Sequence, residues 1–496
     1  MANERLCCDV APRGQLEYPT EAMTRRNQLW SRSLCFLSVA LFATAVAVRA
    51  SAHTTPQKQP NILLVVVDTL RADRLEAYGS HKGLTPFVDS LAERGNVFLH
   101  AYAQSSWTLP SVASLFTSRY PSQHGVTSFD SILPDVETTL AEALRQRGYA
   151  TGGFAANDLI SAANGYAQGF DEFGVFSWGK ERADRVNRES LSWLSSLPPA
   201  RPVFLYLQYM EPHPPYRPPA KMLRTIERRR GRSASLSVQP SDAIILNSRQ
   251  WARADPQALT RLEDLYDAEV MSLDAALRDL FSALQSRSFL DNAVVIVTAD
   301  HGEELMDHGH VGHGVTLYDE VIHVPLIVAL PHQRRGTRQE HVVSLVDVAP
   351  TLLDLVGVSP PPSFEGHVLS EARDRGDSRA ELSAPPLGLQ ASRGDGVAYS
   401  ELIDAASEKM GRKHDRAVVV GQRKLIVGVT GENQHYDLQK DPRETNPNGL
   451  RSLDQLSMRQ TVDRLSTRRA RQETRPSAHH LDEAVRDRTR VLGYGE

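Results

Sequence analysis

The sequence predicts an α/β fold in which helices flank a mainly parallel central sheet and a small C-terminal subdomain follows. Three apolar runs predict inner strands, and they are NILLVVVD at 61–68, VFLYLQYMEPH at 203–213 and NAVVIVTADHG at 292–302. Long apolar runs of this kind are typical of parallel strands that are buried on both faces. Helical patterns separate them, for example TPFVDSLAERG at 85–95, and strands that alternate with helices indicate an α/β sheet.

The composition is that of an ordinary soluble globular protein. Hydrophobic residues make up 41% of the 496 residues, charged residues make up 23%, and the formal net charge is -4. A balance this close to neutral gives no reason to expect nucleic acid as a partner. A chain of this length is expected to hold one large domain with an appendage, or two or three domains.

The N-terminal region has the layout of a secretory signal peptide. Basic residues precede an apolar run at 34–48, and small residues at 50–52 then offer a cleavage site. We therefore predict a signal peptide region at 1–52, with Met23 as the true start. The protein would be secreted or periplasmic, with no stable membrane span after cleavage. An uncleaved N-terminal anchor is the alternative, although an apolar run of about 15 residues is short against the roughly 20 that a span needs.

The positions of the cysteines predict a mature protein without disulfides. Cys7, Cys8 and Cys35 are the only three in the chain, and all precede the expected cleavage site. The mature protein would therefore have no disulfide, no thiolate metal ligand and no cysteine-derived catalytic group.

Composition also divides the rest of the chain. A stretch rich in Arg, Asp, Ser and Pro predicts a linker, and short apolar runs at 417–429 predict antiparallel strands beyond it. A basic, Ser-rich stretch at 224–250 predicts an insertion loop or lid. The predicted parts are a catalytic domain at 60–370, a linker or insertion at 371–396, a small β-rich C-terminal subdomain at 397–448 and a charged helical tail at 449–496.

Polar side chains follow the predicted inner strands. Asp68, His213, Asp300 and His301 all lie just beyond a strand, and ligands of open α/β sheets bind beyond the carboxyl ends of the strands. Adjacent Asp and His side chains at a strand end suit Zn, Mn or Mg. Taken singly, Asp68 could equally cap a helix, and His213 could be exposed in its Pro-rich turn.

A segment rich in hydroxyl groups, QSSWTLPSVASLFTSRYPSQHG at 104–125, raises the question of a nucleophile. Pro110 can begin a helix there, which would place Thr108 just ahead of free amides that attract an anion. The alternative is a helix-capping segment without catalytic function. The candidate hydroxyls belong to Ser105, Ser106, Thr108, Ser111, Ser114 and Thr117.

A third pattern, HGHVGHG at 308–314, sets three histidines at short spacing. By itself this pattern is also compatible with a loop that binds metals adventitiously. At most one or two of its histidines are expected to be functional.

Together these motifs resemble the sulfatase-like family of the alkaline phosphatase superfamily. The resemblance runs from Pro60 to about Asn448 and follows the family's order of motifs. Its main carriers are PNILLVVVDTLRADRLEAYG, TPFVDSLAERGNVFLHAY, TLPSVASLFTSRYPSQHGV, TADHGEE, GHGVTLYDEVIHVPLIV, LVDVAPTLLDLVGV and YDLQKDPRETN. The resemblance implies that family's fold and its ester-cleaving chemistry.

The sequence departs from the family at the nucleophile. In sulfatases a Cys or Ser opens the motif and is oxidised to formylglycine, whereas here the position is Thr108, which cannot give that aldehyde. The Arg of the motif is replaced by Val112, and the second Asp of the first strand is replaced by Thr69. A segment with Lys and His is replaced by TGGFAAND at 151–158, and a later Lys is replaced by His313.

The resemblance and its departures together imply a role for each site residue. One divalent metal ion (Zn, Mn, Ca or Mg) would be held by Asp68, Thr108, Asp300 and His301. Thr108 would be the nucleophile, and His213 and His313 would stabilise charge, one of them as a general acid. A second metal, with His213 or His313 as ligands, stays open as an alternative.

These roles predict an exported hydrolase that cleaves a phosphate or sulfate ester. A formylglycine hydrate has a second hydroxyl that helps expel the bound group, and Thr has only one. The Thr ester must instead be cleaved by attack at the central atom, a route that favours phosphorus. The expected substrate is a small-molecule, glycan or lipid ester. A phosphoethanolamine- or phosphoglycerol-type transferase is the first alternative, and a non-catalytic binding relative is the second.

Overall fold

The computed structural model describes residues 59–176, 183–199, 201–231, 256–370, 396–403, 414–428, 432–449 and 452–470. The predicted signal peptide at 1–52 and all the cysteines lie outside the described residues. So do most of the predicted linker at 371–396, positions 232–250 of the predicted insertion and positions 471–496 of the predicted tail.

One large sheet organises the described residues, and nine of their strands belong to it. Its strand order is β11-β2-β10-β6-β1-β5-β3-β4, and β9 pairs with β2. The strands are β1 (Asn61–Val67), β2 (Asn96–Tyr102), β3 (Ala150–Ala155), β4 (Glu172–Val175), β5 (Val203–Tyr209), β6 (Ala293–Ala299), β9 (His323–Val324), β10 (Leu326–Ala329) and β11 (Arg338–Ser344).

The sheet is mainly parallel, as the sequence predicts. Strand β1 is parallel to β5 on one side and to β6 on the other, and β10 runs antiparallel between β6 and β2. Strands β5 and β6 are buried along their whole length, and β1 is buried after Asn61. Such burial requires a layer of helices on each face, which explains the continuous apolar runs.

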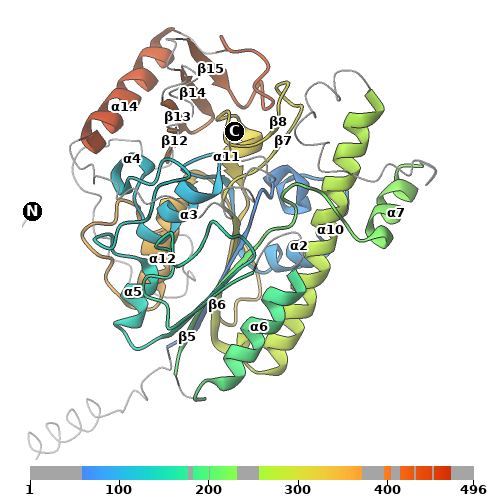
Figure 1. Ribbon diagram of the computed structural model, residues 1–496. Helices are drawn as coiled ribbons and strands as arrows, with labels where there is room; N and C mark the ends of the chain where they lie inside the picture. The colour runs from blue at the N-terminus through green and yellow to red at the C-terminus, as the bar shows by residue number, and fades with distance from the viewer. Residues whose placement is uncertain are drawn as a thin grey trace, which may run out of the picture. The chain divides into compact units, whose positions relative to one another are not determined.

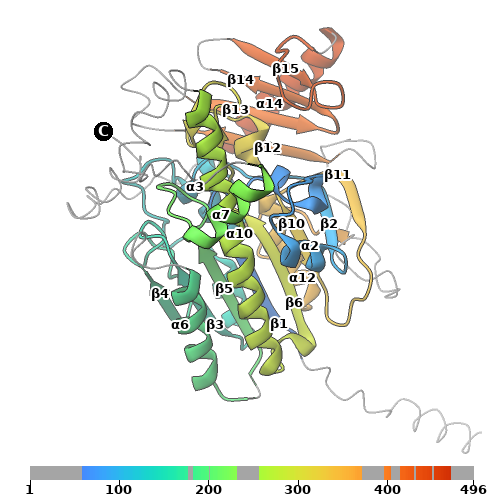
Figure 2. The ribbon, with the colours of Figure 1, turned by 90° about the vertical axis from the view of Figure 1, so that its right-hand side faces the viewer.

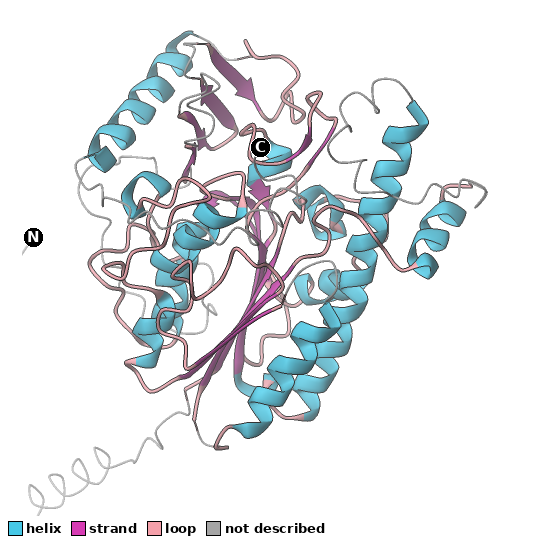
Figure 3. Ribbon diagram, in the orientation of Figure 1, coloured by secondary structure: helices cyan, strands magenta, loops and turns pink. Residues whose placement is uncertain are grey.

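Helices supply the two outer layers (Figures 1 and 3). Figure 1 shows α3, α5 and α12 on one face of the sheet and α2, α6 and α10 on the other. The α-helices of this part of the chain are α2 (Pro86–Ala92), α3 (Thr108–Thr117), α4 (Pro121–His124), α5 (Leu140–Arg145), α6 (Ala183–Ser196), α7 (Ala220–Arg229), α10 (Pro256–Ser286), α11 (Asp319–Ile322) and α12 (Val348–Leu355).

A second sheet is antiparallel and lies near the upper end of the main sheet in Figure 2. It contains β12 (Val397–Leu402), β13 (Asp415–Val420), β14 (Arg423–Val427) and β15 (Asn433–Asp437). The long helix α14 (Ser452–Ala470) places Met458, Val462 and Leu465 in the same buried cluster as residues of this sheet. The antiparallel strands agree with the prediction for 417–429, whereas the predicted domain boundaries stay predictions.

A buried ion pair network joins the second sheet to the part of the chain that forms the main sheet. Lys424 on β14 is fully buried, and its Nζ lies 2.7 Å from Asp319 Oδ1 and 2.8 Å from Glu444 Oε1. A buried ammonium group is tolerated only where paired carboxylates replace its hydration. The network therefore fixes β14 against α11, which carries Asp319.

The predicted insertion begins with helix rather than loop. Helix α7 runs to Arg229, and the side chains of Ile226 and Glu227 on it are buried. Arg230 forms ion pairs with Asp264 and Asp267 of α10. Apolar residues spaced along a basic helix are typical of a helix that packs through one face. The basic composition of 224–250 indicates a loop instead, so composition alone gives the wrong structure here.

Candidate active site

The register of the parallel strands brings the two predicted metal acids together. Val67 of β1 lies opposite Ala299 of β6, so the next residues, Asp68 and Asp300, leave neighbouring strand ends side by side. The backbone amide of Asp68 continues the ladder by donating to the carbonyl of Tyr209, at 2.9 Å. Both carboxylates are completely buried.

His301 completes a group that could hold a metal ion. One donor atom from each of Asp68, Asp300 and His301 lies within 4.8 Å of the others. His301 Nε2 is 3.5 Å from Asp68 Oδ1 and 3.8 Å from Asp300 Oδ2. Two carboxylates and an imidazole form a donor set that suits Zn, Mn and related divalent ions.

Thr108 lies beside this group. Its Oγ1 is 3.4 Å from Asp68 Oδ2 and 3.3 Å from His301 Nε2. Helix α3 begins at Thr108 itself, after an extended Trp107, so the predicted helix start at Pro110 is two residues late. Proline is tolerated anywhere in a first turn, because the amides there have no acceptor within the helix, and its position is therefore a poor guide to the first residue.

The other candidate hydroxyls have different surroundings. Ser111 donates to the carbonyl of Ser105, and Thr117 donates to the carbonyl of Ala113. Ser114 contacts His124 Nε2 at 3.0 Å, and the amide of Val126 donates to His124 Nδ1. The proton of His124 is therefore on Nε2, which cannot accept a proton from Ser114. The hydroxyls of Ser105 and Ser106 are buried without a partner among the described residues.

The environment of the two acids fits a cation. Desolvation raises the pKa of both carboxyls, and the charge of Asp68 raises that of Asp300 further. Asp68 Oδ1 has no hydrogen-bond partner among the described residues although it is fully buried. Adjacent buried carboxylates with an unsatisfied oxygen are costly unless a positive ion neutralises them. These donors therefore fit a divalent metal.

The proton of His301 is on the ring nitrogen away from the acids. His301 Nδ1 lies 2.8 Å from the carbonyl oxygen of Gly302, which can only accept, so Nδ1 donates. The lone pair of Nε2 then faces Asp68, Asp300 and Thr108. A histidine whose second nitrogen donates to a carbonyl is the usual arrangement of a metal ligand.

The structure also brings His213 and His313 to this edge. The ring centroid of His313 is 4.5 Å from that of His301 and 4.9 Å from that of His213. His213 Nδ1 donates to the carbonyl of Pro214, at 2.5 Å, and His313 Nδ1 lies 3.0 Å from Glu303 Oε1. Burial lowers the pKa of His213 well below its usual value and that of His313 to about 3, so burial by itself favours the neutral form of both rings.

His313 reaches the site because its loop folds back. Strands β7 (Glu304–Leu305) and β8 (Val311–Gly312) form a short antiparallel pair, and His313 follows β8. His308 in the same loop points elsewhere. Its Nδ1 is 2.5 Å from Glu320 Oε1, and its ring stacks on Tyr318 at 3.6 Å between centroids.

Three residues contact the predicted site residues and were not predicted. Asn157 Nδ2 donates to Asp68 Oδ2 at 2.9 Å, and Gln208 Nε2 donates to Asp300 Oδ2 at 3.4 Å. Glu303 holds His313, as described above. The sequence contains a feature that could have indicated each of them. Asn157 follows a strand in the altered segment at 151–158, Gln208 is polar inside an apolar strand, and Glu303 belongs to TADHGEE.

The family model that matches this chain is the sulfatase model, which covers residues 60–358. Among curated relatives, arylsulfatase K of Mus musculus is 25% identical over 459 residues, covering 81% of this chain and 79% of the relative.

Two solved structures have a similar fold. The phosphonate monoester hydrolase of Agrobacterium radiobacter has a TM-score of 0.65 at 19% identity, covering 85% of this chain and 100% of that one. A protein solved in complex with its substrate D-glucosamine-2-N,6-O-disulfate has a TM-score of 0.65 at 20% identity, covering 83% of this chain and 98% of that one. At these identities the likeness bears on the fold alone.

Proposed function

The chain belongs to the sulfatase family and is an ester-cleaving hydrolase, and from this premise we propose that it cleaves a phosphate ester through a Thr108 nucleophile. The observation that carries the proposal is the position of Thr108 Oγ1, 3.4 Å from Asp68 Oδ2 and 3.3 Å from His301 Nε2. The family's formylglycine would stand at this position, and a lone hydroxyl imposes different chemistry.

The proposed metal ligands are Asp68, Thr108, Asp300 and His301. When bound, a divalent ion (Zn, Mn, Ca or Mg) would lower the pKa of the Thr108 hydroxyl and neutralise charge on the ester oxygens. Asn157 and Gln208 hold the two carboxylates by donating to them. A second metal held by His213 or His313 stays an alternative.

The chain's own residues would act in two steps. Thr108 Oγ1, which has given its proton to solvent, attacks the phosphorus in line while the bond from phosphorus to the leaving oxygen breaks. The leaving oxygen takes a proton from one protonated imidazole, His213 or His313. The resulting Thr ester has no neighbouring hydroxyl on the same carbon to expel the phosphoryl group, so water must attack the phosphorus. The imidazole that gave up its proton then accepts one at Nε2 from the attacking water, which restores its protonated form as Thr108 Oγ1 is released. The other of the two, His213 or His313, stabilises charge at this edge. The first amides of α3 add positive potential.

A substrate panel tests the proposal. Nitrophenyl phosphodiester, phosphonate monoester, phosphate monoester and sulfate would each be assayed with Zn, Mn, Ca and Mg. We expect turnover of a phosphorus ester to exceed that of the sulfate. A higher kcat/KM for the sulfate would contradict the phosphoester assignment. Transfer to an added alcohol in place of hydrolysis would favour a transferase, and no turnover with any ester would favour a binding protein.

His313→Ala should reveal the leaving-group role. The substitution removes an imidazole held by Glu303 beside His301, and the bound anionic ester would favour its protonated form. We expect a fall of about 10²-fold to 10⁴-fold for poor leaving groups and a smaller one for nitrophenolate. His308→Ala, in the same loop but paired with Glu320, is the control and should leave the leaving-group dependence unchanged. Equal losses across a series of substituted phenols would exclude general-acid catalysis by His313.

We also propose a secreted or periplasmic location, on the strength of the sequence at 1–52. No helix of the described residues has the length and apolar character needed to cross a membrane. The proposed substrate remains a small-molecule, glycan or lipid ester.

A further inference from the structure

The residue after Asp68 has an unfavourable backbone conformation. Thr69 has a φ of 59°, in the left-handed region that β-branched residues rarely adopt. Its side chain is fully buried, and its hydroxyl has no partner among the described residues. Strain of this kind persists only where the surrounding structure holds the residue in place, and it is concentrated at functional sites.

A tyrosine from the long helix α10 holds this turn. The hydroxyl of Tyr266 donates to the carbonyl oxygen of Thr69 at 2.7 Å and accepts from the backbone amide of Arg71 at 3.1 Å. One phenol oxygen thus bridges the residues on either side of Leu70. The Tyr266 ring is fully buried and lies under the guanidinium of Arg74, at 5.6 Å from its centroid.

The turn that Tyr266 closes begins at the first metal acid, beside the second. Thr69 directly follows Asp68, and Asp68 leaves β1 next to Asp300, because Val67 lies opposite Ala299 in the sheet. A change of φ at Thr69 would therefore redirect the chain next to Asp68 and alter its alignment with Asp300.

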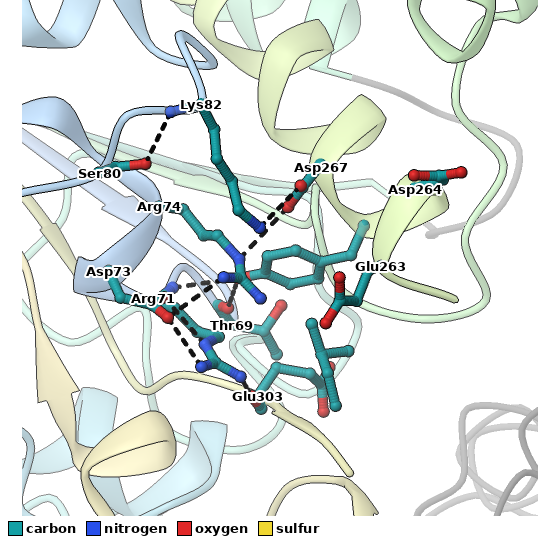
Figure 4. Close-up of polar contacts among 12 residues, drawn as sticks. Thr69, Arg71, Asp73, Arg74, Ser80, Lys82, Glu263, Asp264, Asp267 and Glu303 are labelled. Atoms are coloured by element: carbon teal, nitrogen blue, oxygen red, sulfur yellow. Dashed lines mark hydrogen bonds and ion pairs between the residues drawn. The ribbon is translucent and has the colours of Figure 1, made fainter. Parts of the chain in front are cut away.

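Arg71 ties the same turn to the segment after β6 (Figure 4). Its guanidinium donates to the carbonyl oxygen of Glu303 at 3.1 Å and to Asp307 Oδ2 at 2.7 Å. Glu303 follows Gly302 and holds His313. Tyr266 fixes the backbone amide of Arg71. It therefore also holds the backbone from which the Arg71 side chain reaches across to the segment after β6.

We infer that Tyr266 is a positioning residue, whose hydroxyl keeps Thr69 left-handed and thereby aligns Asp68 with Asp300. The inference rests on the proposed function, since the two acids are the proposed metal ligands. A purely structural tyrosine is the competing interpretation, because a buried phenol needs a hydrogen-bond partner wherever it lies. The two interpretations differ in whether removal of the Tyr266 hydroxyl changes the alignment of Asp68 with Asp300.

Tyr266→Phe tests the inference, because it removes one oxygen and keeps the ring. We expect faster amide hydrogen exchange in a peptide that contains Arg71, measured by mass spectrometry on the metal-free protein. We also expect weaker Mn²⁺ binding in equilibrium dialysis and a lower kcat at unchanged KM. Loss of a residue that orients metal ligands typically costs about 10-fold to 100-fold in metal affinity or activity.

Tyr149→Phe is the matched control. The hydroxyl of Tyr149 donates to the carbonyl of Pro60 at 2.9 Å, at the opposite end of β1. Both substitutions remove bonds from a tyrosine hydroxyl to the backbone beside β1, and only those of Tyr266 lie at the end of β1 that leads to Asp68. Tyr149→Phe should keep the Mn²⁺ affinity and kcat of the wild type.

A second background tests the mechanism of the effect. Glycine adopts positive φ without strain, so Thr69→Gly should need less support from Tyr266. The loss of Mn²⁺ affinity on adding Tyr266→Phe should therefore be smaller in the Thr69→Gly protein than in the wild type. Equal losses in the two backgrounds would contradict action through Thr69.

The outcomes separate this inference from the proposed function. Unchanged exchange of the Arg71 amide, or unchanged Mn²⁺ affinity with unchanged kcat, would show that Tyr266 does not position the acids. If the wild type hydrolyses no ester, the proposed function fails, while hydrogen exchange and Mn²⁺ binding still decide the role of Tyr266.

Discussion

Thr108→Ala should abolish turnover while the protein stays folded. The substitution removes the hydroxyl that lies 3.4 Å from Asp68 Oδ2 and 3.3 Å from His301 Nε2, and with it the proposed nucleophile and one proposed metal contact. Loss of a catalytic nucleophile can cost up to about 10⁶-fold in kcat, and we expect at least roughly 10³-fold here. Steady-state kinetics on a nitrophenyl phosphodiester measure the loss, and thermal unfolding checks the fold.

Two further substitutions at this position separate the chemistries. Thr108→Ser keeps a hydroxyl and should keep part of the activity. Thr108→Cys restores the residue type that sulfatases oxidise, but the motif's Arg is still replaced by Val112. We therefore expect neither conversion to formylglycine nor a gain of sulfatase activity.

The covalent step can be observed directly. Mass spectrometry of quenched turnover mixtures should find a phospho-group on Thr108, in the peptide from Trp107 to Arg119. Ser114→Ala is the control, because Ser114 lies on the same helix but contacts His124, and it should retain the adduct and most activity. An adduct on Ser105, Ser106 or Ser111, in a Thr108→Ala protein that is still active, would show that one of these serines is the nucleophile in place of Thr108.

The central strands and their polar ends could be predicted because each is encoded locally. Six apolar residues of β1 after Asn61 lead directly to Asp68, and the same arrangement recurs where β6 leads to Asp300. Parallel strands in register necessarily present their carboxyl ends at one edge. The juxtaposition of Asp68 with Asp300 and His301 therefore follows from two short stretches of sequence.

The support around these residues could not be predicted in the same way. Tyr266 is one apolar position of a long amphipathic helix, and its sequence context is identical to that of a packing residue. Its role depends on which way α10 is rotated against the turn at 69–71, and only tertiary packing decides that. Asn157 and Gln208 are similar, since their partners lie 89 and 92 residues away in sequence.

The start of α3 shows the limit of local signals more simply. Pro110 predicts a helix start but is compatible with several positions in the first turn, and the observed helix begins at Thr108. The difference of two residues decides whether the proposed nucleophile precedes the helix or is its first residue.

Asp300→Asn should remove most of the bound metal and most of the activity. The Asn side chain has the shape of Asp without its charge. It has one oxygen instead of two, so the amide of His301 and Gln208 Nε2 can no longer each donate to an oxygen of their own. Elemental analysis of the purified variant measures metal content. Full occupancy would refute the assignment of Asp300 as a ligand.

Thermal unfolding provides a second test of Asp300→Asn, in which the metal-free variant should not lose stability. Burial raises the pKa of Asp300, and an acid with a raised pKa opposes folding once the pH exceeds its unfolded value, which is about 3.9. Without metal at pH 7, the Asn variant should therefore be at least as stable as the wild type. With metal at about 100 times its Kd, the wild type should gain roughly 2.7 kcal/mol, and the variant should gain little.

Asp274→Asn is the control for both measurements of Asp300→Asn. Asp274 is also a buried acid, and burial raises its pKa to about 6. It accepts the amides of Phe87 and Val88 at the start of α2, and Asn can take over such a capping role. Asp274→Asn should keep full metal content and the stabilisation by metal. Loss of the metal response in this variant too would indicate a general effect of removing a buried carboxylate, whereas loss in Asp300→Asn alone would place the ion at the ends of β1 and β6.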